Sequence, residues 1–173
     1  EKGTEEVDGL FKTFIRAVTD RIREQKPGFV VSAFHDNAGF IDLDGTHAAC
    51  LKVETHNHPS AIEPYAGANT GLGGVIRDIL GAGLGARPVA SVDVFCFGRP
   101  DAKPESLHGD SIHPLGIFRG VVRGVRDYGN RMGIPTVAGA IHFSEWYTTN
   151  PLVYCGTAGV LPIAEIDKKV YAG

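Results

Sequence analysis

The order of apolar and polar positions along the chain predicts helices and strands that alternate only in part. Near the N-terminus, apolar residues recur at intervals of three and four, which is typical of an amphipathic helix and predicts one over residues 4–25. Short apolar runs bounded by turn residues predict strands. The predicted strands cover residues 29–34, 40–43, 48–56, 88–98, 135–143 and 152–161.

Glycine and proline divide the rest of the chain into loops and helices. Residues 59–74 are rich in both, so they are interpreted as a loop, followed by a helix over 75–83. A long helix that carries several glycines is predicted over 114–132 and ends at a Gly-Ile-Pro sequence. Residues 99–111 are polar and contain proline, which predicts a mobile loop, and no clear element is predicted over 164–173.

The resulting order is a helix, a cluster of strands, a helix, a strand, a helix and two strands. This order favours an α+β fold over a regular βαβ array. We expect a single domain over residues 1–173, with a mixed or antiparallel sheet and helices packed on one face. The other face of the sheet would be bare, so we expect another copy or another domain to cover it.

The amino-acid composition argues against two classes of protein, those that bind nucleic acid and those that associate with membranes. The chain is 43% hydrophobic and 21% charged, and its net charge of −3 gives no basic field, so we expect no nucleic-acid partner. Because no apolar run reaches membrane length and no signal peptide is recognisable, we expect no membrane association. Cys50, Cys96 and Cys155 lie far apart within apolar runs, which predicts buried thiols in a reducing cytosol and a cytoplasmic protein.

The segment KVETHNH (52–58) carries polar side chains at every second position. If the segment is extended, Lys52, Glu54, His56 and His58 stand on one face. One histidine beside a proline often only caps a turn, but four polar groups with this period favour a functional site at the end of a strand.

Two kinds of site fit these residues. The carboxylates of Glu54 and Asp78, together with the cations of Lys52 and Arg77, suit a nucleoside triphosphate: the carboxylates would hold Mg²⁺, and the cations and loop N–H groups would hold phosphate oxygens. The loop lacks the GxxxxGK[ST] motif of a P-loop. The alternative is a zinc or dinuclear centre, in which the two histidines of the segment join the carboxylates, although no HExxH spacing is present.

The string LKVETHNHPSAIEPYAGANTGLGGVIRDILGAGLGARPVA (51–90) resembles the signature of the formylglycinamidine ribonucleotide synthases, the ATP-dependent amidating enzymes of purine biosynthesis. A weaker similarity continues through residues 113–140. The resemblance implies the fold of the N-terminal domain of aminoimidazole ribonucleotide synthetase-like proteins. It also implies that the chain is the first such domain of a longer enzyme.

The resemblance implies ATP and Mg²⁺ as cofactors, with Lys52 contacting the nucleotide and Glu54 and Asp78 each holding a metal ion. Formylglycinamide ribonucleotide would be the substrate. Its site would be lined by a histidine-rich run and one cation: Thr55, His56, Asn57, His58 and Arg77. Of these, His56 would accept the proton.

In the implied reaction, ATP phosphorylates the amide oxygen of the substrate, and ammonia then displaces phosphate to give the amidine. A glutaminase subunit or domain would supply the ammonia, and the remaining synthetase domains would complete the site. We therefore expect the chain alone not to catalyse the reaction. Because N-terminal domains of this family pair through their sheets, we expect the isolated chain to form a homodimer.

Two alternatives remain within the superfamily. One is another ATP-using enzyme, similar to selenophosphate synthetase or thiamine phosphate kinase, although the HNH run is unusual for those relatives. The other is a non-catalytic dimerising scaffold, which would not require the charged residues of the motif to be intact.

Overall fold

The strands form one mixed sheet, described in a computed structural model that covers residues 4, 6–35 and 37–167. The strand order is β1-β2-β3-β6-β4-β5, and all neighbours are antiparallel except β4 and β5. The strands are β1 (Val30–Ser32), β2 (Gly39–Asp42), β3 (His47–Thr55), β4 (Arg87–Phe97), β5 (Thr136–Phe143) and β6 (Leu152–Pro162). The six predicted strands are therefore confirmed, with ends that shift by one or two residues.

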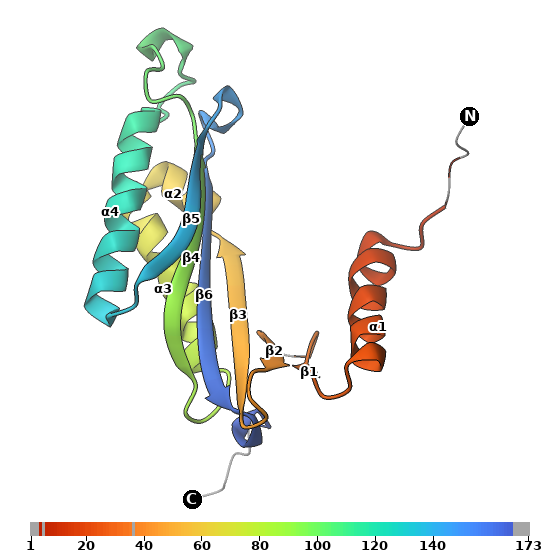
Figure 1. The fold of residues 1–173 in the computed structure, drawn as a ribbon. Helices are drawn as coiled ribbons and strands as arrows, with labels where there is room; N and C mark the ends of the chain where they lie inside the picture. Colours follow the sequence, from red (N-terminus) through yellow and green to blue (C-terminus); the bar gives the residue numbers. More distant parts are fainter. Residues whose placement is uncertain (1–3, 5, 36, 168–173) are drawn as a thin grey trace, which may run out of the picture.

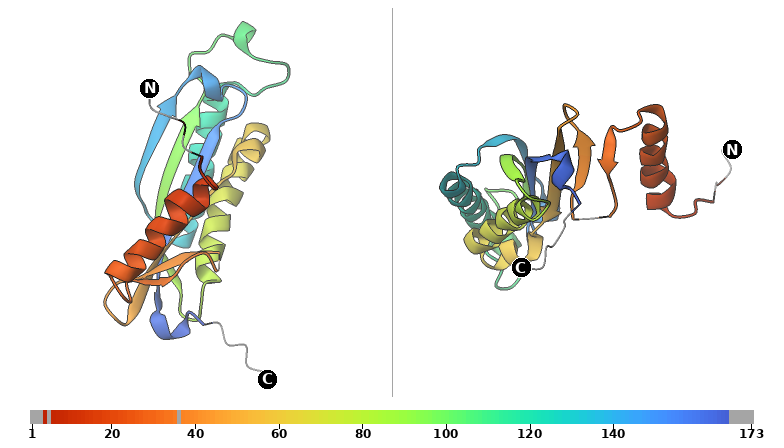
Figure 2. Two further views of the ribbon diagram at one scale, coloured as in Figure 1. Left: turned by 90° about the vertical axis from the view of Figure 1, so that its right-hand side faces the viewer. Right: turned by 90° about the horizontal axis from the view of Figure 1, so that it is seen from below.

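Three helices cover one face of this sheet (Figure 1). They are α2 (Asn57–Ile62), α3 (Pro64–Leu80) and α4 (Pro114–Met132). The π-helical η1 (Phe11–Arg16) continues into α1 (Ala17–Gln25), which lies beyond the β1 edge of the sheet in Figure 1 and in the right-hand view of Figure 2. Three short 3-10 turns complete the set: η2 (Pro104–Ser106), η3 (Glu145–Tyr147) and η4 (Ile163–Glu165). The predicted α+β fold with helices on one face is confirmed.

The helices of the described chain are too short or too polar to cross a membrane. Of the predicted helices, α4 matches its expected range, since Pro114 occupies its first position and Gly133 ends it with a left-handed φ of 68°. All three cysteines are buried and free, as expected.

The first helix begins later than predicted. Helical structure starts at Leu10 rather than at residue 4, because Gly9 has a φ of +76° that a right-handed helix cannot accommodate. Glu5, part of the expected start, lies outside the described residues. The apolar stripe of the helix faces solvent, with Leu10 72% exposed, and only Phe11 finds an aromatic partner among the described residues, the ring of Phe34 at 5.1 Å.

The glycine-rich segment 59–74 is helical, and the predicted loop is wrong. It forms most of α2 and most of α3, and three of its four glycines lie where other parts of the chain come too close for a side chain. A Cβ at Gly73 would lie 2.8 Å from the hydroxyl of Tyr128 in α4, and one at Gly67 would lie 2.6 Å from the backbone of Ser60. Tertiary packing here outweighs the low helix propensity of glycine.

The core has two parts on the helix-covered face. The larger part lies between the sheet and the helices α3 and α4, around Leu72, Phe97 and Val121. The smaller lies under β2 and β3, around Phe40 and Ile79. Helix α3 contributes to both parts, so its position fixes the whole covered face.

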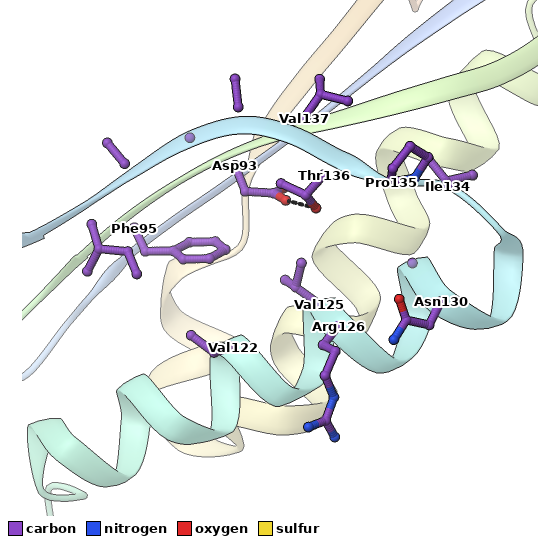
Figure 3. A pocket seen from close by; sticks show the side chains of 15 residues that line it. Asp93, Phe95, Val122, Val125, Arg126, Asn130, Ile134, Pro135, Thr136 and Val137 are labelled. Atoms are coloured by element: carbon purple, nitrogen blue, oxygen red, sulfur yellow. Dashed lines mark hydrogen bonds between the residues drawn. The ribbon is translucent and has the colours of Figure 1, made fainter.

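A cavity of about 700 Å³ lies between the edge strand β5 and helix α4 (Figure 3). On its β4 side is Asp93, which is 4% exposed and whose Oδ2 accepts a hydrogen bond of 3.0 Å from Thr136 Oγ1. Its Oδ1 has no hydrogen-bond partner among the described residues. Burial raises the pKa of Asp93, and the bond from Thr136 offsets only part of this effect.

Asp93 should therefore make stability depend on pH. Because its pKa in the folded protein exceeds the usual 3.8, the folded protein holds this proton more tightly than the unfolded chain, and stability falls as pH rises above that value. Asp93→Asn keeps an oxygen for Thr136 and cannot ionise. We expect its free energy of unfolding at pH 7 to exceed the wild-type value by about 1 kcal/mol or more, in urea unfolding. A difference that does not shrink toward pH 4 would contradict this explanation.

Two alanine substitutions in α3 should change stability in opposite directions. In Gly67→Ala the new Cβ meets the backbone of Ser60 and Pro59, which cannot move aside as a side chain could, so we expect a loss of about 1–3 kcal/mol. In Gly74→Ala the nearest atoms are 3.9 Å away, and the gain in helix propensity should stabilise the protein by up to about 1 kcal/mol. Urea unfolding measures both, and equal effects would argue against the packing explanation.

Candidate functional site

Charged side chains gather where β3 passes α3 on the covered face of the sheet. Along β3, Cys50 is buried and Lys52 and Glu54 follow on the same face. In the register with the neighbouring strands, Glu54 lies opposite Cys155, which lies opposite Asp93. The covered face therefore begins apolar at the start of β3 and becomes charged toward its end.

Lys52 joins two carboxylates from different elements. Its Nζ lies 2.8 Å from Glu54 Oε1 and 3.0 Å from Asp78 Oδ2 of α3. The lysine side chain is 16% exposed, whereas that of Glu54 is 54% exposed, so the cluster opens to solvent on the glutamate side. The hydrogen bond to Glu54, with a further contribution from Asp78, raises the pKa of Lys52, so the bridging ammonium stays charged.

Arg77 lies close to this cluster, beside Gly74 of α3, whose missing side chain leaves space there. Glu54 Oε2 and Arg77 Nη2 lie 3.9 Å and 4.0 Å from the point that a Cβ on Gly74 would occupy. A glycine at this position of α3 thus leaves space between a carboxylate and a guanidinium. The structure brings together the two carboxylates and two cations that the sequence singled out.

The position of Asp78 differs from the prediction. The sequence placed it in the first turns of a helix after a glycine loop, but it lies in the last turns of α3, because the helix already begins at Pro64. The expected loop N–H groups are therefore bonded within the helix and do not face a phosphate. Side chains alone form the charged cluster.

His56 marks the point where the chain leaves the strand. Strand β3 ends at Thr55, and His56 has a φ of −134° and a ψ of 56° as it enters α2. Its side chain packs against α3, where a Cβ on Gly71 would lie 2.9 Å from the His56 Cβ. The ring Nδ1 is buried and forms no hydrogen bond within the part of the chain that the structure describes.

The expectation that the four polar groups of KVETHNH share one strand face is half right. Lys52 and Glu54 do, but His58 belongs to α2 and is exposed. Thr55 lies opposite Tyr154 of β6, on the bare face of the sheet. Because Gly71 and Gly74 are three residues apart on α3, His56 and the charged cluster nevertheless lie along the same side of that helix, about 5 Å apart along its axis.

Asn57 and Ser60 hold the chain where it turns after β3. The backbone N–H of Val153 donates to Asn57 Oδ1 at 2.7 Å, and Ser60 Oγ donates to the carbonyl oxygen of His56 at 2.6 Å. No role for Ser60 was predicted from the sequence. A helical interpretation of residues 57–62 would have placed it four residues after His56, the spacing that this bond requires.

Two cavities of the described chain contain none of these residues. The cavity beside Asp93 is lined by β4, β5 and α4, and a second of about 500 Å³ lies between the 99–111 loop and residues 145–149. The charged cluster lies toward the C-terminal end of β3 and is open to solvent at Glu54, so it forms one wall of a site.

The donor set of the cluster fits a divalent cation with oxygen ligands. Both Glu54 and Asp78 touch one ammonium group, so their oxygens already converge on a single positive charge. Mg²⁺ needs only one or two carboxylates when phosphate and water supply the other ligands. Zinc finds less support, because no three His, Cys, Asp or Glu side chains gather as ligands within residues 4, 6–35 and 37–167.

Known proteins share both the sequence and the fold. The chain is 48% identical over 136 residues to the phosphoribosylformylglycinamidine synthase subunit PurL of Thermoplasma acidophilum, which covers 79% of this chain and 17% of that protein. Among solved structures, Thermotoga maritima PurL complexed with FGAR matches with a TM-score of 0.61 and 39% identity, over 83% of this chain and 21% of that one. The same protein complexed with ATP matches with a TM-score of 0.60 and 36% identity, over 87% of this chain and 24% of that one.

The chain thus spans about a fifth of the length of the relatives it matches. Within it, residues 35–161 match the family model of the AIR synthase related protein, N-terminal domain, and this range contains β2 to β5, all of β6 except its last residue, and the whole charged cluster. The chain belongs to that family of AIR synthase related N-terminal domains.

Proposed function

We propose that this chain is the first N-terminal domain of a phosphoribosylformylglycinamidine synthase. It would supply part of the site at which formylglycinamide ribonucleotide, ATP and ammonia give the amidine. The observation that carries the proposal is the Lys52 bridge between Glu54 and Asp78 beside Arg77, since it is a partly open site for a metal-bound triphosphate. The complexes of Thermotoga maritima PurL with ATP and with FGAR support the choice of ligands.

The charged residues would have different roles in binding the nucleotide and its metal. Lys52 would contact ATP, and Glu54 and Asp78 would each hold Mg²⁺. When bound, the metal would neutralise charge on the phosphoryl group that moves to the amide oxygen. Because the carboxylates already pair with Lys52, the ammonium must give them up when it turns to the phosphates.

The residues after the strand would face the second substrate. Arg77 would contact the ribonucleotide, and Thr55, Asn57 and His58 would line its site together with His56. As ammonia displaces phosphate from the activated carbon, nitrogen must lose protons, and His56 would accept one of them. The ring Nδ1 of His56, which has no hydrogen-bond partner among the described residues, suits this role.

The rest of the site would come from other parts of the assembly. The chain corresponds to 17% of the length of its Thermoplasma relative, so further synthetase domains and a glutaminase subunit or domain that supplies ammonia are part of the proposal. We place the protein in the cytoplasm, where free cysteines such as Cys50 and Cys155 remain reduced.

Lys52→Met should separate nucleotide binding from metal binding. Without the ammonium, calorimetry of the full-length protein with Mg²⁺ and a non-hydrolysable ATP analogue should show affinity reduced by about tenfold or more. Without nucleotide, Mn²⁺ should bind more tightly than to the wild type, since the carboxylates have lost their internal cation. Mn²⁺ binding is measured by electron paramagnetic resonance.

Lys12→Met is the control, because it removes the same charge from an exposed pair with Asp8. It should change neither affinity. If Lys52→Met binds nucleotide as the wild type does, Lys52 has no role in ATP binding. Unchanged Mn²⁺ affinity would show that lysine and metal do not compete for the carboxylates.

The bare face of the sheet suits pairing with a second such domain. Leu51 and Val53 of β3 are 54% and 37% exposed on this face. Tyr154, which lies opposite Thr55 in the register, and Val94, which lies opposite Tyr154, are half-buried on the same face. Several apolar side chains on neighbouring strands make a surface that monomers rarely leave open. In a complete synthase, the equivalent face of another N-terminal domain would cover it.

The purified 173-residue chain should accordingly dimerise through this face. Light scattering over a range of concentrations should give a dimer mass for the wild type and a monomer mass for Leu51→Lys, since a charge at the centre of the contact would be buried. Leu84→Lys is the matched control, because Leu84 is 67% exposed in the turn after α3. A monomeric wild type, or a dimeric Leu51→Lys variant, would contradict the proposed contact.

A further inference from the structure

The ladder between β3 and β6 continues one step beyond the end of β3. The last regular pair joins Thr55 to Tyr154, and the next would join His56 to Val153. An antiparallel pair of this kind exchanges two backbone bonds. Only the first is regular: the N–H of His56 donates to the carbonyl of Val153 at 2.8 Å.

A side chain supplies the second bond of this step. The N–H of Val153 donates to Asn57 Oδ1 at 2.7 Å, and the His56 carbonyl that would have accepted it instead receives Ser60 Oγ at 2.6 Å. Asn57 thus replaces a strand carbonyl while the main chain turns into α2. Val153 is fully buried, so without the amide oxygen its N–H would lose its only direct acceptor among the described residues.

This exchange holds the backbone of His56 from both sides. One bond fixes its N–H to β6, a second fixes its carbonyl to Ser60, and the Asn57 side chain fixes the following residue to the same point of β6. The side chain also packs against α3, where Gly71 lies directly against its Cβ. His56 is therefore placed by its neighbours and not by a bond to its own ring Nδ1, which has no partner in the described part of the molecule.

We propose that Asn57 stands at the substrate site as a positioning residue: its amide oxygen fixes the His56 imidazole for proton transfer, and its side chain is not itself a ligand of the substrate. The proposal rests on the proposed function, because His56 is the proton acceptor only in that reaction. It assigns the Asn57 side chain to β6, whereas a substrate ligand would use its NH₂ group.

Asn57→Asp and Asn57→Ala distinguish the two roles in the full-length protein. Aspartate keeps an oxygen for the Val153 N–H but loses the NH₂ group, and alanine loses both. For a positioning residue, Asn57→Ala should lower kcat about a hundredfold with little change in KM for formylglycinamide ribonucleotide, and Asn57→Asp should keep most of the wild-type kcat. Asn69→Ala is the matched control, because it removes a half-buried side-chain bond to the Tyr65 carbonyl on α3 and should leave both constants unchanged.

A second measurement does not depend on activity. The rate at which diethyl pyrocarbonate modifies His56, read by peptide mass spectrometry, should rise at least about tenfold in Asn57→Ala as the ring loses its fixed place. It should match the wild type in Asn57→Asp and Asn69→Ala.

Each outcome bears on one of the two proposals. If Asn57→Asp raises KM and loses kcat as severely as Asn57→Ala, Asn57 is a substrate ligand and the inference is overturned. It is also overturned if neither variant changes His56 reactivity, or if Asn57→Ala fails to fold and Asn57→Asp alters that reactivity. An inactive wild type with the expected reactivity pattern would refute the proposed function and leave the positioning intact.

Discussion

The close approach of helix α3 to the sheet is the constraint on which the site depends. A Cβ at Gly67 or Gly71 would lie within 2.9 Å of atoms at the turn that follows β3, and one at Gly73 would meet α4. Small residues at these positions let the helix sit where Asp78 reaches Lys52 and where His56 is held against the helix. The same helix bridges the two halves of the core, so its fit to the sheet connects stability to the geometry of the charged side chains.

The sequence predicted the strands better than the glycine-rich helices, for a physical reason. Strands such as β4 are largely apolar runs that can be recognised from the local sequence. The glycines of α3 are explained only by their contacts with Ser60, His56 and Tyr128, which the sequence alone does not reveal. The alternation of polar residues in KVETHNH pointed to the charged residues before the resemblance did, and Lys52, Glu54 and Asp78 do meet. The Asn57 bond to Val153, across 96 positions of sequence, had no local signal.

The ion pairs that Lys52 forms with Glu54 and Asp78 stabilise the charged cluster when no ligand is bound. Two carboxylates brought within reach of each other would repel, and the Lys52 ammonium between them removes that cost without a bound ion. Because the glutamate side is open to solvent, the arrangement can exchange its internal cation for an external one without opening the core. The domain therefore presents charged groups that are already paired and already in place.

The alternation of β3 has a consequence for redesign of this domain. Between Lys52 and Glu54 lies Val53, whose side chain emerges on the bare face of the sheet. Only the backbone of β3 separates the bare face, which a neighbouring domain would cover, from the side chains of Lys52 and Glu54, which face α3. An insertion or deletion of a single residue in this strand would exchange the two faces, sending the lysine into the contact and the valine toward the carboxylates. The proposed domain contact and the proposed nucleotide site thus use alternate positions of one strand, and neither can be redesigned without regard to the other.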